Sequence, residues 1–124
     1  MIINTKLAPS AIGPYSQGVV FGNLIYTSGQ LPIDPNTCEF AGDTIKEQTM
    51  QSLNNVKSIL EEAGSSMEKV IKTTVFLSDM KNFSDMNEIY AEFFKEGNYP
   101  ARSAVEVAKL PKGALVEIEV VAYK

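Results

Sequence analysis

Residues 115–121 read Leu-Val-Glu-Ile-Glu-Val-Val, and this stretch near the end of the chain decides how the fold is interpreted. Side chains alternate between the two faces of a β-strand, which places three of them together: Val116, Ile118 and Val120. The opposite face then carries a mixed set: Leu115, Glu117, Glu119 and Val121. A face that combines apolar side chains with carboxylates is unusual for contact with water alone. We therefore predict a strand over Leu115–Ala122, with its mixed face in an oligomer interface that contains polar sites.

The rest of the chain contains the signals of two helices and further strands. Thr44 and Glu47 fit a capping box before an apolar helical repeat that Gly64 ends, which predicts a helix of about five turns. A second amphipathic helix is predicted from Phe83 to a stop at Gly97. Further strands are predicted in four runs: Val19–Phe21 and Leu24–Tyr26, which form a hairpin around Gly22-Asn23, then Val70–Leu77 and Arg102–Val107.

The order of these elements is hairpin, helix, strand, helix, strand, strand. It predicts an α+β fold in which both helices cover one face of a mixed sheet. The chain has 124 residues, which suffices for one domain with a real core. Because no internal repeat or linker is evident, we expect a single domain over residues 1–124.

Composition and charge exclude several classes of protein. The net charge is −4 and the basic residues are scattered, whereas a face that binds nucleic-acid phosphates needs clustered Lys and Arg. No apolar stretch approaches the ~18 residues of a membrane span, and the first residues lack the pattern of a signal peptide. Cys38 is the only cysteine and cannot form an internal disulfide. These features predict a cytoplasmic protein with neither nucleic-acid nor membrane partners.

The absence of histidine narrows the chemistry further. It excludes Ser-His and Cys-His nucleophile systems, and one cysteine cannot supply an ordinary zinc site. No Gly-rich phosphate-binding loop is present. We therefore expect no metal and no cofactor, and chemistry that relies on carboxylates, Arg, Lys, Tyr, hydroxyls, backbone groups and water.

Arg102 is the first candidate for such chemistry. Its guanidinium presents a rigid fork that matches a carboxylate, and strand alternation places it on one face with Ala104 and Glu106. Two structural interpretations compete with this one. Arg102 could be a solvated surface charge, or it could form a cross-strand pair with Glu117 or Glu119.

The other candidates also have competing interpretations. Glu117 and Glu119 could supply a base or hold a water, or they could be a charged strand rim. Tyr15 could line a pocket or pack its ring in a turn. Ser28 and Gly29 place a hydroxyl and a bare backbone at a strand end, where either a ligand or a turn would fit. Asn87 is interpreted as a satisfied buried amide, and Cys38 receives no role.

Five stretches, in order along the chain, together resemble one known family. Pro-Ala-Arg-Ser-Ala-Val-Glu-Val-Ala-Lys-Leu (100–110), followed by Val-Glu-Ile (116–118), is similar to its C-terminal signature. Four more stretches match its other motifs: Ala11–Gly18, Thr27–Gln30, Gln51–Val56 and Lys72–Phe76. On this pattern the chain resembles the RidA family, also called YjgF or L-PSP, over essentially its whole length.

The resemblance implies a chorismate-mutase-like fold and a homotrimer with its sites in clefts between subunits. Members of its deaminase subgroup hydrolyse 2-iminopropanoate and 2-iminobutanoate to 2-keto acids and ammonia. These imines are released by pyridoxal-phosphate-dependent dehydratases. The resemblance also leaves open a binding or regulatory protein that senses a small carboxylate, and an RNA-cleaving activity that the acidic charge and the lack of histidine disfavour.

The resemblance assigns roles to particular residues. Arg102 would bind the substrate carboxylate, and Glu117 would orient the attacking water. Further substrate contacts are implied for Tyr15 and for the backbone of Ala104. We also expect Ser28, Gly29 and Ser103 to contact the substrate. Many relatives carry cysteine where this chain has Ala104, which still offers its backbone. Asn87 and Glu119 are expected to position these groups without contacting the substrate themselves.

Overall fold

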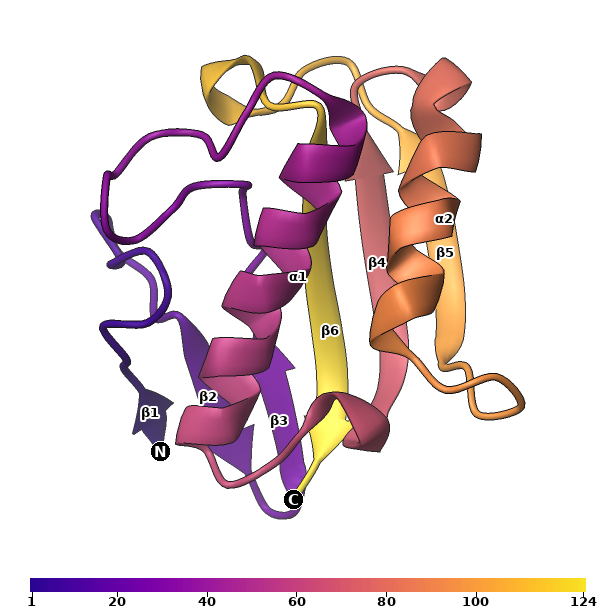
Figure 1. The fold of residues 1–124 in the computed structure, drawn as a ribbon. Coiled ribbons are helices and arrows are strands. Elements are labelled where there is room, and N and C mark those ends of the chain that lie inside the picture. Colours follow the sequence, from indigo (N-terminus) through magenta and orange to yellow (C-terminus); the bar gives the residue numbers. More distant parts are fainter.

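The computed structural model describes residues 1–124 and contains one six-stranded mixed sheet (Figure 1). The strands lie in the order β1-β2-β3-β6-β4-β5, and only β4 and β5 run parallel. Their bounds are Ile2–Ile3 (β1), Gly18–Phe21 (β2), Leu24–Thr27 (β3), Val70–Leu77 (β4), Ala101–Glu106 (β5) and Val116–Tyr123 (β6). The predicted hairpin is confirmed as β2 and β3, and β5 forms an outer edge of the sheet.

Both helices pack against the same face of the sheet, as predicted (Figure 1). Thr44 and Glu47 form the predicted capping box at the start of the first helix. Buried apolar side chains of the helices and the sheet form one cluster of 18 residues between the two layers. The helical elements are α1 (Ile45–Glu62), α2 (Phe83–Phe93) and the 3-10 turns η1 (Met67–Lys69), η2 (Met80–Asn82) and η3 (Pro111–Gly113).

The end of α2 differs from the prediction, because the helix stops at Phe93 and not at Gly97. Phe94 has an extended backbone, and its ring packs against Tyr90 with the ring centroids 4.6 Å apart. Gly97 lies in the turn that follows, with a positive φ of 86°. Phe94 thus keeps its apolar contact with Tyr90 from an extended backbone, and the apolar repeat does not require the helix to continue to Gly97.

β6 has the two faces that its alternation predicts. The helix side is fully apolar and buried: Val116, Ile118, Val120 and Ala122. Glu117, Glu119 and Val121 are half-buried on the opposite face. The prediction for Leu115 is wrong, since it precedes the strand, packs against the core and donates its N–H to Oε1 of Gln48.

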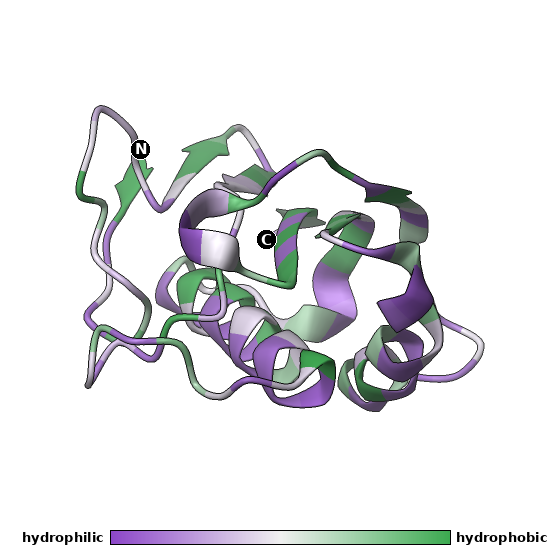
Figure 2. Ribbon diagram, turned by 90° about the horizontal axis from the view of Figure 1, so that it is seen from above, coloured by the Kyte–Doolittle hydropathy of each residue, from purple (hydrophilic) through white to green (hydrophobic).

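The face of the sheet opposite the helices is left without a covering layer (Figure 2). Strand register places an apolar group on this open face beside the two carboxylates: Val19, Phe21, Tyr26, Phe76, Val105 and Val121. Phe21 is 81% exposed and Tyr26 is 44% exposed. Contiguous exposed apolar surface of this kind marks an interaction site. None of the helices combines the length and the apolar character that crossing a membrane would need.

Candidate functional site

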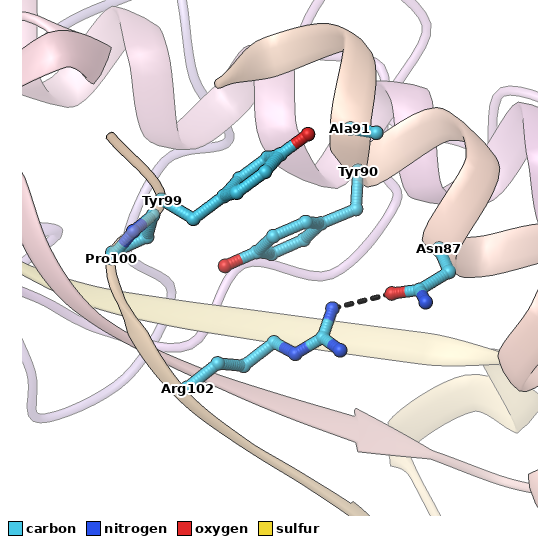
Figure 3. Close-up of a pocket in the computed structure, with 6 residues that line it drawn as sticks. All are labelled: Asn87, Tyr90, Ala91, Tyr99, Pro100 and Arg102. Atoms are coloured by element: carbon cyan, nitrogen blue, oxygen red, sulfur yellow. Dashed lines mark hydrogen bonds between the residues drawn. The ribbon is translucent and has the colours of Figure 1, made fainter. Parts of the chain in front are cut away.

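A cavity of about 500 Å³ opens beside Arg102, where α2 packs over the start of β5 (Figure 3). We call it the Arg102 pocket, and its lining is Asn87, Tyr90, Ala91, Tyr99, Pro100 and Arg102. The first three residues come from α2, and the others come from the connection to β5 and from β5 itself. Two consecutive elements therefore build this pocket.

Arg102 is held in the pocket by an amide and by aromatic rings. Its Nη1 donates to Oδ1 of Asn87 over 2.5 Å, and its guanidinium carbon lies 4.7 Å from the ring centroid of Tyr90 and 5.3 Å from that of Phe83. The oxygen of Asn87 thus has Arg102 as its partner, but the side chain is half-buried at the pocket and not fully buried as predicted. Helical spacing places Phe83, Asn87 and Tyr90 on one face of α2, a signal that could have found the two rings from the sequence.

The charge of Arg102 has no acidic partner in the chain. The two ion pairs present are Lys46–Glu88 and Lys57–Glu61. A guanidinium has five N–H donors, and only the one bonded to Asn87 has an acceptor in the chain. A half-buried cation with free donors at a cavity is suited to binding an anion, and a carboxylate matches its fork best.

A second cavity, of about 330 Å³, lies at the start of β6 on the open face. This Glu117 pocket combines predicted site residues with loop residues: Pro9, Ser10, Ile12, Tyr15, Gly29, Gln30, Leu31, Ile33, Pro111, Lys112 and Glu117. Burial raises the pKa of the Glu117 carboxyl above its usual value, and the neighbouring charge of Glu119 raises it further. The carboxyl is therefore poised to exchange a proton closer to neutral pH than an ordinary glutamate.

Gly29 lies directly against the carboxyl of Glu117. A Cβ placed on Gly29 would come within 2.0 Å of Oε2 of Glu117 and within 2.8 Å of its Cδ. Only glycine leaves room for this approach, so the bare backbone that the sequence places at the strand end has a defined neighbour. Gly29 and Glu117, which were both predicted as site residues, are therefore neighbours in the structure.

The segment that carries Tyr15 is fastened by two polar side chains. Gln17 is buried, accepts the N–H of Thr5 at 2.7 Å, and donates to three backbone carbonyls between Thr5 and Pro9. Ser28 donates its hydroxyl to the carbonyl of Ser16 at 2.6 Å. The Ser28 hydroxyl therefore positions the Tyr15 segment in this chain.

The two pockets lie on opposite faces of the sheet. Arg102 pairs in register with Thr73, which is buried on the helix side, whereas Glu117 pairs with Phe76 on the open side. β4 lies between β5 and β6, so the cross-strand pair of Arg102 with Glu117 or Glu119 is wrong. One chain brings together Arg102 with Asn87, and Tyr15 with Gly29 and Glu117, but it does not bring the two sets together.

The neighbours of Arg102 on β5 divide between the same two faces. Ala104 shares the face of Arg102 and is half-buried against the core. Ser103 faces the open side, where its Oγ accepts from Nζ of Lys72 at 3.0 Å. Glu119 stands beside Glu117 on the open side. No group of three or more His, Cys, Asp or Glu side chains is arranged to hold a metal ion.

Comparison with known proteins identifies the family. A family described as Endoribonuclease L-PSP matches residues 5–124. The 2-iminobutanoate/2-iminopropanoate deaminase of Escherichia coli strain K12 is 51% identical over 124 residues, which cover 98% of this chain and 96% of the relative. The chain belongs to the RidA family, also called YjgF or L-PSP.

Solved RidA family structures share the whole fold. The YjgF protein of Escherichia coli has a TM-score of 0.95 and 50% identity, with 100% of this chain and 98% of that chain covered. Escherichia coli TdcF, solved with bound serine, has a TM-score of 0.94 and 46% identity over the same shares of the two chains. The predicted α+β fold of the RidA family is thereby confirmed, and the family includes imine deaminases.

Proposed function

We propose that this RidA family member is a cytoplasmic, cofactor-independent 2-iminobutanoate/2-iminopropanoate deaminase. It would hydrolyse the reactive imines released by pyridoxal-phosphate-dependent dehydratases. The observation that carries the proposal is the half-buried guanidinium of Arg102, which has no acidic partner and has free donors at a cavity. The substrate carboxylate is the partner that this fork lacks, and the 51% identity to a deaminase supports the choice of substrate.

The active site would be shared between two subunits of a homotrimer. Arg102 and Glu117 lie on opposite faces of the sheet with β4 between their strands, so a substrate of four carbons cannot contact both within one chain. A second copy that brings its Glu117 pocket to the Arg102 pocket would complete the site. The uncovered apolar face of the sheet supports such an assembly, because stable oligomers bury surfaces of this kind.

The chemistry follows from these groups. Arg102 fixes the carboxylate, and the imine carbon is already electrophilic once its nitrogen is protonated. Glu117 takes one proton from the attacking water as the C–O bond forms at C2, and returns it to the nitrogen of the resulting carbinolamine. The Glu117 carboxylate then takes the remaining hydroxyl proton as the C=O bond forms, the C–N bond breaks and ammonia leaves. The raised pKa of Glu117 makes its carboxylate a stronger proton acceptor than that of an ordinary glutamate. Backbone groups of Gly29 and Ala104 would hold the imine nitrogen, and the ring of Tyr15 would close the site.

A coupled assay tests the function. A dehydratase generates 2-iminobutanoate, and release of 2-oxobutanoate is followed with and without this protein. We expect a clear acceleration, which is lost when Arg102 is replaced by Ala and retained after exhaustive chelation of metals. A rate equal to spontaneous hydrolysis with the folded wild-type protein would refute the deaminase.

The main alternative is a protein that binds a small carboxylate without converting it. The TdcF structure with bound serine favours carboxylate binding in the family. Glu117 separates the two functions, because a binding protein has no need of a half-buried carboxyl that exchanges protons. The description of the matching family also names an endoribonuclease. The net charge of −4 and the scattered basic residues provide no face for phosphates, so we do not propose RNA cleavage.

A further inference from the structure

We propose that Tyr90 is a positioning residue for Arg102: its ring, fixed by the hydrogen bond between its hydroxyl and Thr73, holds the guanidinium with its free donors toward the pocket. The inference rests on the proposed function for the identity of the substrate. Its physical content needs only that Arg102 binds a carboxylate.

The first support is how the charge of Arg102 is stabilised. A half-buried guanidinium is usually neutralised by a carboxylate, which consumes the fork. Here the nearby groups are the faces of Tyr90 and Phe83 and the oxygen of Asn87. Aromatic faces attract a cation without accepting its in-plane N–H groups as a carboxylate does. The charge is therefore partly compensated while the donors stay available.

The second support is how firmly Tyr90 is held. Its side chain is 5% exposed, its hydroxyl lies 2.8 Å from Oγ1 of the fully buried Thr73, and its ring packs on Phe94. Thr73 is the residue of β4 that pairs in register with Arg102. Tyr90 therefore contacts Arg102 through its ring and the strand position beside Arg102 through its hydroxyl. This closed arrangement fixes the ring relative to the backbone that carries the guanidinium.

The arrangement determines how a carboxylate approaches. Asn87 occupies one donor of the guanidinium, and the aromatic rings lie against it. Figure 3 shows the ring of Tyr90 alongside the guanidinium, between Arg102 and Tyr99. A small monocarboxylate can then bind in the plane of the fork through the donors that remain. A loose Arg102 would lose this alignment without losing its charge.

Calorimetry with 2-oxobutanoate, the keto acid that a deaminase would release, tests the role independently of turnover. Tyr90→Leu removes the ring face and should weaken 2-oxobutanoate binding by about 3- to 30-fold. Tyr90→Phe and Thr73→Val remove one side of the hydroxyl pair and should each weaken it by about 2- to 5-fold. The double variant Tyr90→Phe/Thr73→Val should lose no more affinity than the weaker-binding of these two single variants, because the two hydroxyls act as one unit. For the imine, the loss should appear mainly in KM.

Phe93→Leu is the matched control. It removes an aromatic ring from the same helix at a half-buried position that lines a different cavity, away from Arg102. It should lower the melting temperature and leave 2-oxobutanoate affinity unchanged. Sedimentation and thermal melts establish that each variant is folded and assembled like the wild type.

The outcomes separate this inference from the proposed function. Unchanged affinity in folded Tyr90→Leu, or an equal loss in Phe93→Leu, overturns the positioning role even if the wild type is a deaminase. Should Tyr90→Leu fail to fold, unchanged affinity in both Tyr90→Phe and Thr73→Val, with lowered melting temperatures, overturns it equally. A wild type that binds 2-oxobutanoate and does not hydrolyse the imine refutes only the deaminase, and Tyr90→Leu then still decides the positioning role. A wild type that binds no 2-oxobutanoate contradicts both.

Discussion

The Arg102 pocket and the Glu117 pocket are built in opposite ways. The first is made mainly by two consecutive elements, α2 and β5, with Tyr99 and Pro100 of the short connection between them. The second is made where the Tyr15 segment, the 29–33 segment and η3 converge around one strand residue, Glu117. A pocket made by regular elements is rigid once the core forms, whereas a pocket made by loops depends on the few side chains that tie the loops down. The proposed active site therefore combines a rigid half, the Arg102 pocket, with a more adjustable half, the Glu117 pocket.

Mixing two inactive variants tests most directly whether the two pockets form one active site across subunits. Arg102→Ala and Glu117→Gln should each lose about 100-fold or more in turnover. If the site joins the two pockets across subunits, mixed trimers regain sites that have an intact Arg102 on one chain and an intact Glu117 on the next. Random mixing in equal amounts should restore activity to about a quarter of the wild-type level.

Coexpression or reassembly from the dissociated state, followed by the coupled assay, measures this recovery. Arg102→Ala mixed with itself is the control and should recover nothing. If hybrid assemblies form and the mixture is no more active than its parent variants, the active site does not join the two pockets across subunits.

Arg102→Lys tests the rigid half. Lysine keeps the charge and loses the planar fork, so a bidentate contact becomes a single one and kcat/KM should fall by about 10- to 100-fold. The melting temperature should change little, since no ion pair within the chain is lost. Steady-state kinetics and a thermal melt measure the two effects. Near-normal turnover with a lowered melting temperature would assign Arg102 a structural role.

Gly29→Ala tests the adjustable half. The new Cβ would displace the Glu117 carboxyl, and kcat should fall by about 10-fold because the proton acceptor is misplaced. Gly42→Ala is a matched control, since its Cβ would meet the carboxylate of Glu47 at 2.4 Å in the cap of α1, outside both pockets. Single-turnover kinetics should show the loss only for Gly29→Ala. Adding Glu117→Gln to Gly29→Ala should cost little more than Glu117→Gln alone, and full additivity would argue against a shared action.

The smallest effect concerns stability as a function of pH. The pKa of Glu117 is raised in the folded state by burial and by Glu119, so its ionisation opposes folding. Its contribution to stability is complete at acidic pH, below the unfolded pKa, and is lost as the pH rises through the raised folded pKa. Glu117→Gln lacks this loss and should melt slightly above the wild type at neutral pH, with the difference shrinking in acid. A variant that melts below the wild type at neutral pH would contradict this.

Local signals predicted much of the fold. The Thr44–Glu47 capping box and the alternation in β6 act over a few residues, and both appear in the structure as predicted. The end of α2 differs from the prediction, because Phe94 keeps its apolar contact with Tyr90 from an extended backbone, so the apolar spacing did not reveal where the helix ends. Leu115 was misplaced because its bond to Gln48 on α1 spans 67 residues.

The two cavities contain residues that the sequence singled out, but the arrangement of these residues was not predictable. Arg102, Glu117 and Gly29 all lie at cavities, yet no spacing reveals that β4 separates the strands of Arg102 and Glu117. The sequence pattern indicates no more for Tyr90 than an apolar position of the amphipathic helix that begins at Phe83. Its contact with Arg102 depends on the parallel pairing of β4 with β5, which brings α2 over β5, and periodicity carries no information on that pairing.

Gln17 controls how often the amino-terminal segment of the protein opens locally. Residues 4–17 contain no helix or strand, and this one carboxamide joins four backbone groups of Thr5, Ala8 and Pro9. We expect that breaking those bonds, together with the core contact of Ala8, releases the segment while both helices and the central strands stay folded, so that its amide hydrogens exchange with solvent through a local opening. The amide of Thr5, bonded to Gln17, reports that opening directly, whereas the amides of β4 exchange only when the whole chain unfolds. We therefore expect the segment that carries Tyr15 to open and close many times before the core unfolds once.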